Sequence, residues 1–194
     1  MPRSLCVFAG STPGNVPQFA DAARELGREL ALRGHALVYG GGQSGLMGIL
    51  ADAALAAGAH VTGVIPEFLV EGELAHRGLS DLKVVRSMHE RKDAMARLAD
   101  GFVALPGGFG TLEELFEVVT WAQLGLHDKP CGLLNVSGYY DGLLSFLDGA
   151  VNAQFVKGAQ REKVLVATGA RALLDRFDAV QAPPGSRPLR KDLT

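Results

Sequence analysis

The sequence predicts a single-domain α/β protein, built as a doubly wound parallel sheet flanked by helices. Its 194 residues match the usual length of one domain. Short apolar runs alternate with longer segments of helical periodicity along most of the chain. The apolar runs are rich in Val, Leu and Ile without regular polar alternation, which is typical of parallel strands buried on both faces. This repeated rhythm of strand and helix favours the doubly wound fold.

Strands are predicted where the apolar runs lie, in chain order at residues 5–9, 36–39, 61–65, 82–85, 102–105, 132–135 and 164–167. Helices are predicted at residues 17–33, 45–57, 88–99, 112–124, 139–152 and 170–177, because apolar residues recur there at helical spacing. In sheets of this type, ligands bind beyond the carboxyl ends of the strands, where the winding direction reverses. Functional residues are therefore expected in the turns that follow the strands.

Two segments fall outside this rhythm. Residues 66–80 show no clear periodicity and carry several charged side chains, Glu73 among them. A connection of this length inside a compact domain is typical of a binding loop or lid. Residues 181–194 are rich in proline, and we expect a disordered tail there, which leaves residues 1–180 as the domain.

The charge balance argues against a nucleic-acid partner. The chain has 19 basic and 21 acidic residues and a formal net charge of −2. Proteins that bind duplexes gain much of their affinity from clustered Lys and Arg side chains. The main basic cluster, residues 187–191, lies in the terminal tail. A small anion needs only a local site and is compatible with this composition.

Neither a metal site nor a membrane segment is indicated. Cys6 and Cys131 each lie in an apolar run and are best interpreted as small buried hydrophobes. No His/Cys spacing typical of a metal site appears, so no metal is expected. The apolar stretch near the N-terminus is too short for a signal peptide, and no run approaches the roughly 18 apolar residues of a membrane helix. We therefore expect a cytoplasmic protein.

Three glycine-rich turns follow predicted strands. They are residues 9–14 with Ser11, residues 39–48 with Gly41 and Gly42, and residues 105–114 with Gly107, Gly108 and Gly110. Glycines leave backbone N–H groups accessible, and the N-terminus of a helix adds a partial positive charge that favours phosphate. One such turn is compatible with a plain tight turn, but three at the same end of one sheet predict a nucleotide site.

The details of these turns disfavour two nucleotide chemistries. None of them is followed by Gly-Lys-Ser/Thr, which a Walker A loop requires. The second turn loosely resembles a dinucleotide fingerprint, but no acidic residue closes the next strand at residues 61–65. NAD binding and ATP hydrolysis are therefore disfavoured.

The helix after the third turn has a structural interpretation and a functional one. Thr111 and Glu114 fit a capping box, in which Glu114 would only satisfy a backbone N–H at its own helix start. The proline and glycines just upstream are not explained by capping. The predicted apolar stripe consists of Leu112, Leu115, Phe116, Val119 and Ala122, which leaves Glu113, Glu117 and Thr120 on another face.

The helix predicted at residues 88–99 places two cations beside its apolar stripe. Met88, Met95 and Leu98 form the stripe, and Arg91 and Lys92 lie on it or next to it. The spacing leaves two alternatives equally open: the cations extend to solvent at the edge of the stripe, or they point into an anion site. Asp93 and Arg97 are expected to form an i,i+4 ion pair on a solvated face.

At this point the residues resemble a known family. Residues 87–92, Ser-Met-His-Glu-Arg-Lys, followed by residues 106–114, Pro-Gly-Gly-Phe-Gly-Thr-Leu-Glu-Glu, resemble the Lonely guy family of cytokinin-activating phosphoribohydrolases. Residues 39–48, 120–125, 128–130 and 132–140 are similar to the same family. The resemblance extends from about residue 5 to about residue 178. Related sequences are often labelled lysine decarboxylases, but no Lys lies in a recognisable pyridoxal-phosphate context here.

The resemblance implies a homodimer with a Rossmann-like fold that needs no cofactor. It implies hydrolysis of an N6-modified AMP to a free base and ribose 5-phosphate, with Arg91 and Glu114 as the catalytic pair. Residues implied or expected to contact the nucleotide are Ser11, Gly41, Gly42, Glu73, Met88, Lys92, Gly107, Gly108, Phe109, Gly110, Thr111, Leu112, Glu113 and Thr120. The segment that contains Glu73 departs most from the family's pattern.

Two alternatives accompany this interpretation. A non-catalytic nucleotide-binding carrier, of the molybdenum-cofactor-carrier type, would keep the glycines but has no need of Arg91 combined with Glu114. General AMP nucleosidase activity is the closest enzymatic alternative, and the sequence leaves open which base is preferred. A dimer is also expected because Val118 and Trp121 lie outside the predicted apolar stripe of their helix.

Overall fold

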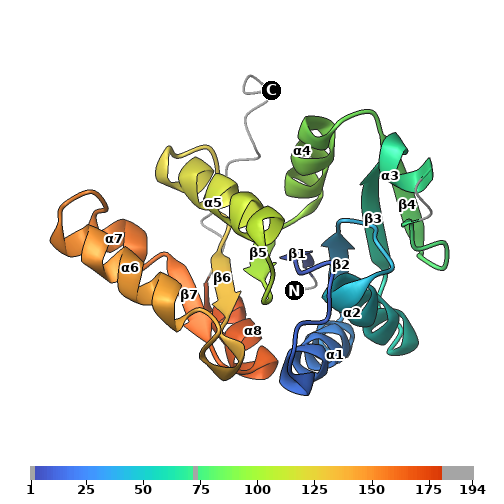
Figure 1. Ribbon diagram of the computed structural model, residues 1–194, viewed down its shortest axis with the longest axis horizontal. Helices are drawn as coiled ribbons and strands as arrows, with labels where there is room; N and C mark the ends of the chain where they lie inside the picture. Colours follow the sequence, from blue (N-terminus) through green and yellow to red (C-terminus); the bar gives the residue numbers. More distant parts are fainter. Residues whose placement is uncertain (1–2, 72–73, 181–194) are drawn as a thin grey trace.

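The computed structural model describes residues 3–71 and 74–180, and it shows the predicted fold class (Figure 1). Seven parallel strands form one sheet in the order β4-β3-β2-β1-β5-β6-β7, with helices on both faces. The expected contact Glu73 and the expected disordered tail at residues 181–194 lie outside the described residues.

Every predicted strand and helix is present, with ends shifted by a few residues. The strands are β1 Ser4–Phe8, β2 Ala36–Tyr39, β3 Val61–Pro66, β4 Asp81–Val85, β5 Gly101–Ala104, β6 Cys131–Leu134 and β7 Val164–Ala167. The long helices are α1 Pro17–Leu32, α2 Gly45–Ala56, α4 Met88–Leu98, α5 Phe109–Gln123, α6 Asp141–Asn152 and α8 Ala170–Ala179. Three short elements were not predicted from the sequence: α3 Glu67–Glu71, the 3-10 turn Val136–Gly138 and α7 Gly158–Arg161.

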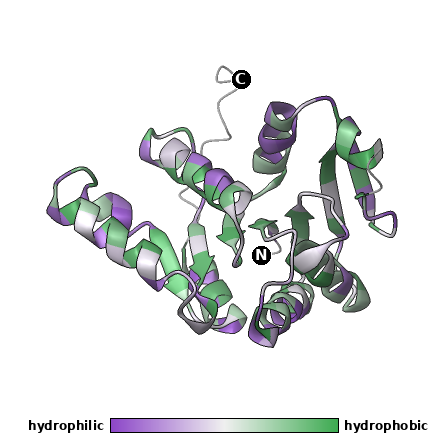
Figure 2. Cartoon of the chain, viewed as in Figure 1, coloured by the Kyte–Doolittle hydropathy of each residue, from purple (hydrophilic) through white to green (hydrophobic). Residues whose placement is uncertain are grey.

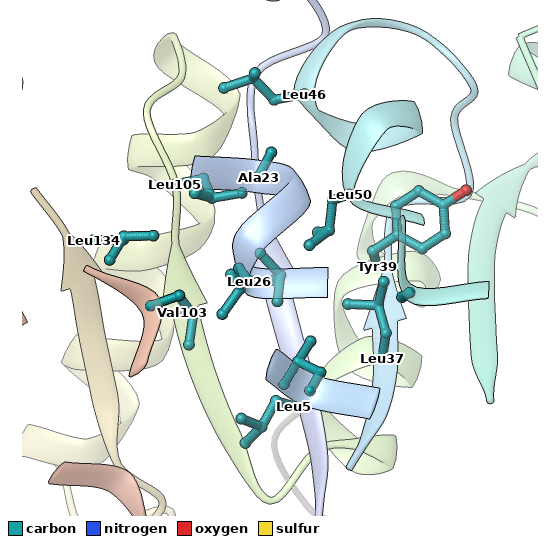
Figure 3. Packing of buried hydrophobic residues seen from close by; sticks show 14 of the residues in the cluster. Leu5, Ala23, Leu26, Leu37, Tyr39, Leu46, Leu50, Val103, Leu105 and Leu134 are labelled. Atoms are coloured by element: carbon teal, nitrogen blue, oxygen red, sulfur yellow. The ribbon is translucent and has the colours of Figure 1, made fainter. Parts of the chain in front are cut away.

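The sheet is buried on both faces, as its apolar strands predict. Along β1, Leu5 and Val7 pack in the cluster that contains α1, α2 and α8 (Figure 3), whereas Cys6 and Phe8 pack with residues of α4 and α5. Figure 2 shows that apolar colour predominates along the strands, whereas the helices carry polar residues as well. Both cysteines are free and buried, as expected.

The strand order fixes where a ligand can bind. From β1 the chain adds β2, β3 and β4 on one side and then returns to add β5, β6 and β7 on the other. The winding direction therefore reverses between β1 and β5, and the crevice beyond the carboxyl ends of these strands is the expected ligand site. The three glycine-rich turns follow β2, β1 and β5, which are neighbours in the sheet.

The segment between β3 and β4 is more ordered than a plain loop. It begins with the short helix α3, and Ala75 then forms an isolated bridge with Gly42. The N–H of His76 donates to the carbonyl oxygen of Gly41 over 2.9 Å, and its ring contacts the Asp52 carboxylate of α2 at 2.8 Å. This segment is therefore attached to the second glycine-rich turn.

The buried face of α5 differs from the predicted stripe. Its buried residues are Thr111, Leu115 and Val118, whereas Phe116 is 36% exposed. Val118 packs against the core of its own chain, so counting it as surplus apolar surface was wrong. The burial of Thr111 was missed because the helix begins at Phe109, three residues before its predicted start.

Across the described residues, no helix combines the length and the apolar character that a membrane span requires.

Candidate active site

The three glycine-rich turns meet at the carboxyl ends of the strands. The N–H of Gly10 donates to the carbonyl oxygen of Pro106 over 3.1 Å, and the carbonyl oxygen of Gly10 accepts from the N–H of Leu46 over 3.0 Å. Gly45 has a φ of 62° and lies directly against the Ser11–Thr12 backbone, where a Cβ atom would overlap it. The turns therefore form one connected backbone surface, as the sequence predicts.

The helix after the third turn begins earlier than predicted. Its N-cap is Gly108, and the carbonyl oxygen of Gly108 accepts the first helical bond from Leu112. Thr111 is thus inside the first turn, and the capping-box interpretation of Thr111 and Glu114 was wrong. The Thr111 side chain is buried and packs against Gly107, where a Cβ atom would overlap its hydroxyl.

The glycines at the start of α5 border open space. A Cβ atom on Gly108 or Gly110 would meet no protein atom within 4 Å, and neither residue has a positive φ. Their lack of a side chain is therefore not required by the fold. The first N–H groups of a helix have no intrahelical acceptor, and with the helix dipole they favour an anion. This end of α5 has both the room and the polarity for a phosphate.

Arg91 lies under the turns and is fixed by the backbone. It is 9% exposed, and its Nη2 and Nε atoms donate to the carbonyl oxygens of Gly40 at 2.9 Å and Val64 at 3.1 Å. Its Nη1 atom lies 3.8 Å from the sulfur of Met88. Of the two alternatives for this cation, extension to solvent is wrong, because its guanidinium points inward at the ends of β2 and β3.

Lys92 connects the two helices that flank the site. Its Nζ atom pairs with Oε1 of Glu113 and with Oε1 of Glu117, the latter at 3.0 Å. Both carboxylates belong to α5, so the ion pairs tie α4 to α5 next to Glu114. Partial burial lowers the pKa of Lys92, because it disfavours the charged form. The pairing with Glu113 and Glu117 outweighs this effect, so the pKa lies above its usual value. On the outer side of α4, Asp93 and Arg97 form the expected i,i+4 pair at 2.8 Å.

The Glu114 side chain extends from α5 and is partly buried. Desolvation raises the pKa of its carboxyl to about 7, and the nearby charges of Glu113 and Glu117 act in the same direction. Arg91 and Lys92 oppose this shift. The side chain also lines a small cavity with Phe8, Lys92, Ala96, Glu117 and Val118. A carboxyl that changes charge near neutral pH, beside a fixed guanidinium, is typical of a catalytic acid or base.

The remaining predicted contacts lie at different distances from this centre. Ser11, Gly41 and Gly42 lie in the connected turns, and Met88 begins α4 beside Arg91. Phe109 is 95% exposed at the first position of α5. Thr120 is exposed and lies nine residues after Thr111, which is about 13 Å along the helix axis. The structure does not bring Thr120 to the turns. Among the described residues, no group of three His, Cys, Asp or Glu side chains could hold a metal ion.

Sequence reasoning missed the residues that hold the site together. Gly40 and Val64 carry the carbonyl oxygens that fix Arg91, and the space that Arg91 occupies excludes a Cβ atom on Gly40. Tyr139 and Tyr140 donate hydrogen bonds to the third turn from the start of α6. The only available signal for the tyrosines was their place in a segment similar to the family.

This chain is similar in sequence to one family model and to several named relatives. A family model described as "Possible lysine decarboxylase" matches residues 47–177. The chain is 51% identical over 177 residues to a probable cytokinin riboside 5′-monophosphate phosphoribohydrolase of Oryza sativa subsp. japonica, covering 91% of this chain and 71% of the relative. It is also 51% identical over 176 residues to a cytokinin riboside 5′-monophosphate phosphoribohydrolase of Arabidopsis thaliana, covering 91% and 83%.

Similar solved structures have lower sequence identity. The molybdenum cofactor binding protein of Rippkaea orientalis has a TM-score of 0.70 at 22% identity, covering 93% of this chain and 98% of that one. The molybdenum cofactor carrier protein of Chlamydomonas reinhardtii has a TM-score of 0.69 at 20% identity, with coverage of 93% and 98%. At these identities the likeness concerns the fold alone.

Proposed function

This chain belongs to the Lonely guy family of cytokinin riboside 5′-monophosphate phosphoribohydrolases, and we propose that it hydrolyses the N-glycosidic bond of N6-modified AMP. The products are a free cytokinin base and ribose 5-phosphate. Unmodified AMP is a second substrate of the same site. The observation that carries this proposal is a partly buried carboxyl, Glu114, on the helix whose start has open space at Gly108 and Gly110, close enough to the fixed guanidinium of Arg91 for the two charges to interact.

The nucleotide is held first by its phosphate. The 5′-phosphate binds at the start of α5, where Gly108 and Gly110 leave open space. Ser11 follows Gly10, whose backbone is bonded to the third turn and to Leu46 after the second turn, so Ser11 and the second turn, with Gly41 and Gly42, form the neighbouring wall. Leu112 and Glu113 follow in the first turns of α5, and Phe109 and Met88 offer apolar surface at the rim.

Glu114 acts on the ribose. As the base leaves, positive charge develops on the sugar ring, and a carboxylate near the anomeric carbon stabilises that charge. The same carboxylate orients the attacking water and accepts its proton. A pKa of about 7 leaves Glu114 ionised in a large share of molecules at neutral pH while keeping it basic enough to take a proton.

Arg91 orients the substrate. Two of its five N–H donors are used by the carbonyl oxygens of Gly40 and Val64, which hold the plane of the guanidinium. The remaining donors of this rigid fork serve the ribose or phosphate oxygens. Lys92 supplies a second positive charge, and its pairing with Glu113 and Glu117 sets where that charge lies.

The carrier alternative rests on fold alone. The molybdenum cofactor proteins share the architecture at 20–22% identity, whereas the phosphoribohydrolases match at 51% over nine-tenths of the chain. A carrier has no chemical need for a carboxyl whose pKa is raised next to a guanidinium. The enzyme is therefore the better-supported function.

The protein is further proposed to act as a homodimer in the cytoplasm. Phe116 of α5 and Leu124 at its C-cap are large apolar side chains, 36% and 66% exposed, and a partner copy would cover them. The thiols of Cys6 and Cys131 are free and buried, which is compatible with a reducing compartment. Sedimentation analysis gives the mass in solution, and a monomer would refute the dimer.

Product analysis tests the activity directly. The purified protein is mixed, without added metal, with AMP and separately with isopentenyladenosine 5′-monophosphate. Release of free base and ribose 5-phosphate is expected from both, and the ratio of the two rates identifies the preferred base. Tight binding of both nucleotides without turnover would favour the carrier instead.

A further inference from the structure

The third glycine-rich turn is held by its own carbonyl groups. Three successive carbonyl oxygens of the turn each accept one hydrogen bond from a residue outside it, two from adjacent tyrosines and one from the first turn. The donors are Tyr140 Oη to Leu105 at 2.6 Å, Gly10 N to Pro106 at 3.1 Å and Tyr139 Oη to Gly107 at 2.7 Å. The orientation of each peptide group in the turn is therefore fixed from outside.

Fixing a carbonyl group also fixes the N–H group of the same peptide. The peptide unit is planar, and in the trans form its C=O and N–H bonds point in opposite directions. Because Tyr139 holds the carbonyl oxygen of Gly107, the N–H of Gly108 points away from Tyr139. Gly108 is the N-cap of α5, and a Cβ atom there would lie in open space.

We propose that Tyr139 is a positioning residue, which orients the Gly107–Gly108 peptide so that the N–H of Gly108 donates to the nucleotide's 5′-phosphate. This inference rests on the proposed function, which places that phosphate at the start of α5. Hydrogen bonds to a charged acceptor are about twice as strong as neutral ones, so the direction of this N–H affects phosphate affinity strongly.

Tyr139 is itself held firmly, although it is 45% exposed. Its ring packs edge-on against Phe19 with ring centroids 5.5 Å apart, and Phe19 lies against Gly14 at the end of the first turn. The segment before Tyr139 is fixed by Asn135, whose side chain accepts from the N–H of Tyr140 and donates to Asp141, each over 2.7 Å. Tyr139 thereby links the first and third glycine-rich turns.

Tyr140 provides a matched comparison. Its hydroxyl also donates to the turn, and its side chain is almost fully buried. The carbonyl group that it holds belongs to the Leu105–Pro106 peptide, and proline has no N–H group. The hydrogen bond of Tyr140 therefore orients no donor toward the ligand. Its loss affects the stability of the turn but does not selectively affect phosphate recognition.

The test measures binding of AMP and of adenosine by calorimetry in chains that carry Glu114→Gln, so that AMP is not hydrolysed during the titration. The parent chain carries Glu114→Gln alone, and it is compared with chains that carry Tyr139→Phe or Tyr140→Phe in addition. In Tyr139→Phe we expect AMP affinity to fall about tenfold, as for one misdirected charge-assisted bond, with adenosine affinity unchanged. Tyr140→Phe should lower the melting temperature while keeping the ratio of AMP to adenosine affinity. In steady-state assays, Tyr139→Phe should raise KM for AMP more than it lowers kcat.

Two results would overturn the inference, and they can be told apart. If the Glu114→Gln parent prefers AMP over adenosine and the added Tyr139→Phe keeps that full preference, Tyr139 does not position the phosphate donor, while the proposed function stands. If the Glu114→Gln parent binds AMP and adenosine equally, the phosphate is not recognised at the start of α5, and both proposals fail.

Discussion

The Nη2 atom of Arg91 donates a hydrogen bond to the carbonyl oxygen of Gly40 over 2.9 Å, and the guanidinium fills the space where a side chain on Gly40 would begin. The end of β2 thus holds one member of the proposed catalytic pair. A second bond, to the carbonyl oxygen of Val64, fixes the plane of the guanidinium. The position of Arg91 depends on the absence of a Cβ atom from a residue that is 51 positions away in the sequence.

Gly40→Ala should therefore impair catalysis by displacing Arg91. The added methyl group would overlap Nη2, so the guanidinium must move away from its two carbonyl acceptors. A misplacement of about 1 Å at a positioned group commonly costs about 10²-fold in rate. We expect kcat/KM for AMP to fall by about that factor while the protein remains folded, as measured by steady-state kinetics with circular dichroism.

The control for this substitution is Gly149→Ala in α6. A Cβ atom at Gly149 meets no protein atom within 4 Å, and alanine favours a helix interior over glycine by about 1 kcal/mol. This variant should keep wild-type kinetics and unfold at the same or a higher temperature. Full activity in Gly40→Ala would show that the fixed position of Arg91 is not needed.

Gly110→Ala tests whether the open space at the start of α5 holds substrate. A methyl group there touches nothing in the free protein, so the melting temperature should not fall. A nucleotide bound at this helix start would meet the methyl group, and KM for AMP should rise about tenfold, equivalent to about 1.4 kcal/mol. An unchanged KM would place the phosphate elsewhere.

The pH dependence of turnover should report Glu114. The carboxyl has a pKa of about 7, and the proposed mechanism needs its ionised form. We expect kcat/KM for AMP to rise with pH and level off above about 7, because kcat/KM reports ionisations of the free enzyme. The substrate phosphate titrates near pH 6, so binding of ribose 5-phosphate over the same pH range serves as the control.

Removing the Glu114 carboxylate should abolish the rise of kcat/KM with pH. Glu114→Gln should lower kcat by about 10²–10³-fold while leaving AMP binding largely intact. An active Glu114→Gln enzyme would refute the catalytic assignment, whatever the shape of the wild-type profile.

Substitutions at two charged neighbours of Glu114 should shift the pH profile of kcat/KM in opposite directions. The charge of Lys92 lowers the pKa of Glu114, and the charge of Glu113 raises it. Lys92→Met should therefore shift the rising limb of kcat/KM to higher pH, and Glu113→Gln should shift it to lower pH. Shifts in the same direction would mean that the limb reports another group. Because Lys92 and Glu113 are an ion pair, the double variant should not show the sum of the two shifts.

The strands were the most predictable part of the fold, whereas one helix start and the short helices were less predictable. The strands are apolar on both faces, so burial could be predicted for Leu5 and for Cys6 although they pack on opposite faces of the sheet. The start of α5 was misplaced because Thr111 and Glu114 imitate a capping box, whereas Gly108 is the N-cap. The short helices α3 and α7 have five and four residues, too few to show a helical period.

The direction in which a long side chain points could not be predicted from the spacing of residues in the sequence. Arg91 could be placed beside an apolar stripe, but its acceptors on Gly40 and Val64 are 51 and 27 residues away. The tyrosine bonds that hold the third turn span 32 and 35 residues and follow from the packing of α6 beside β5 and β6. The glycine-rich turns were predictable because backbone geometry gives them a local signature.

The free energy of unfolding should also depend on the ionisation of Glu114, and the raised pKa of Glu114 sets the direction of this dependence. Its pKa is about 7 in the folded state and 4.5 as an ordinary glutamate, so between these pH values the folded state holds a proton that the unfolded state has lost. The free energy of unfolding therefore decreases as pH rises from about 4.5 to about 7. The cost above pH 7, from burying the carboxylate, is at most about 3 kcal/mol.

Glu114→Gln removes this cost, because the amide is neutral at every pH. Urea unfolding should show the variant to be more stable than the wild type at pH 8, with most of the gain lost at pH 5. Glu25→Gln, at an exposed position on α1, is the control and should change stability by a similar small amount at both pH values. If Glu114→Gln has the same effect at pH 5 and pH 8, the carboxyl is not destabilised by burial. The raised pKa would then be absent, and with it the physical basis for a base that is half-ionised at neutral pH.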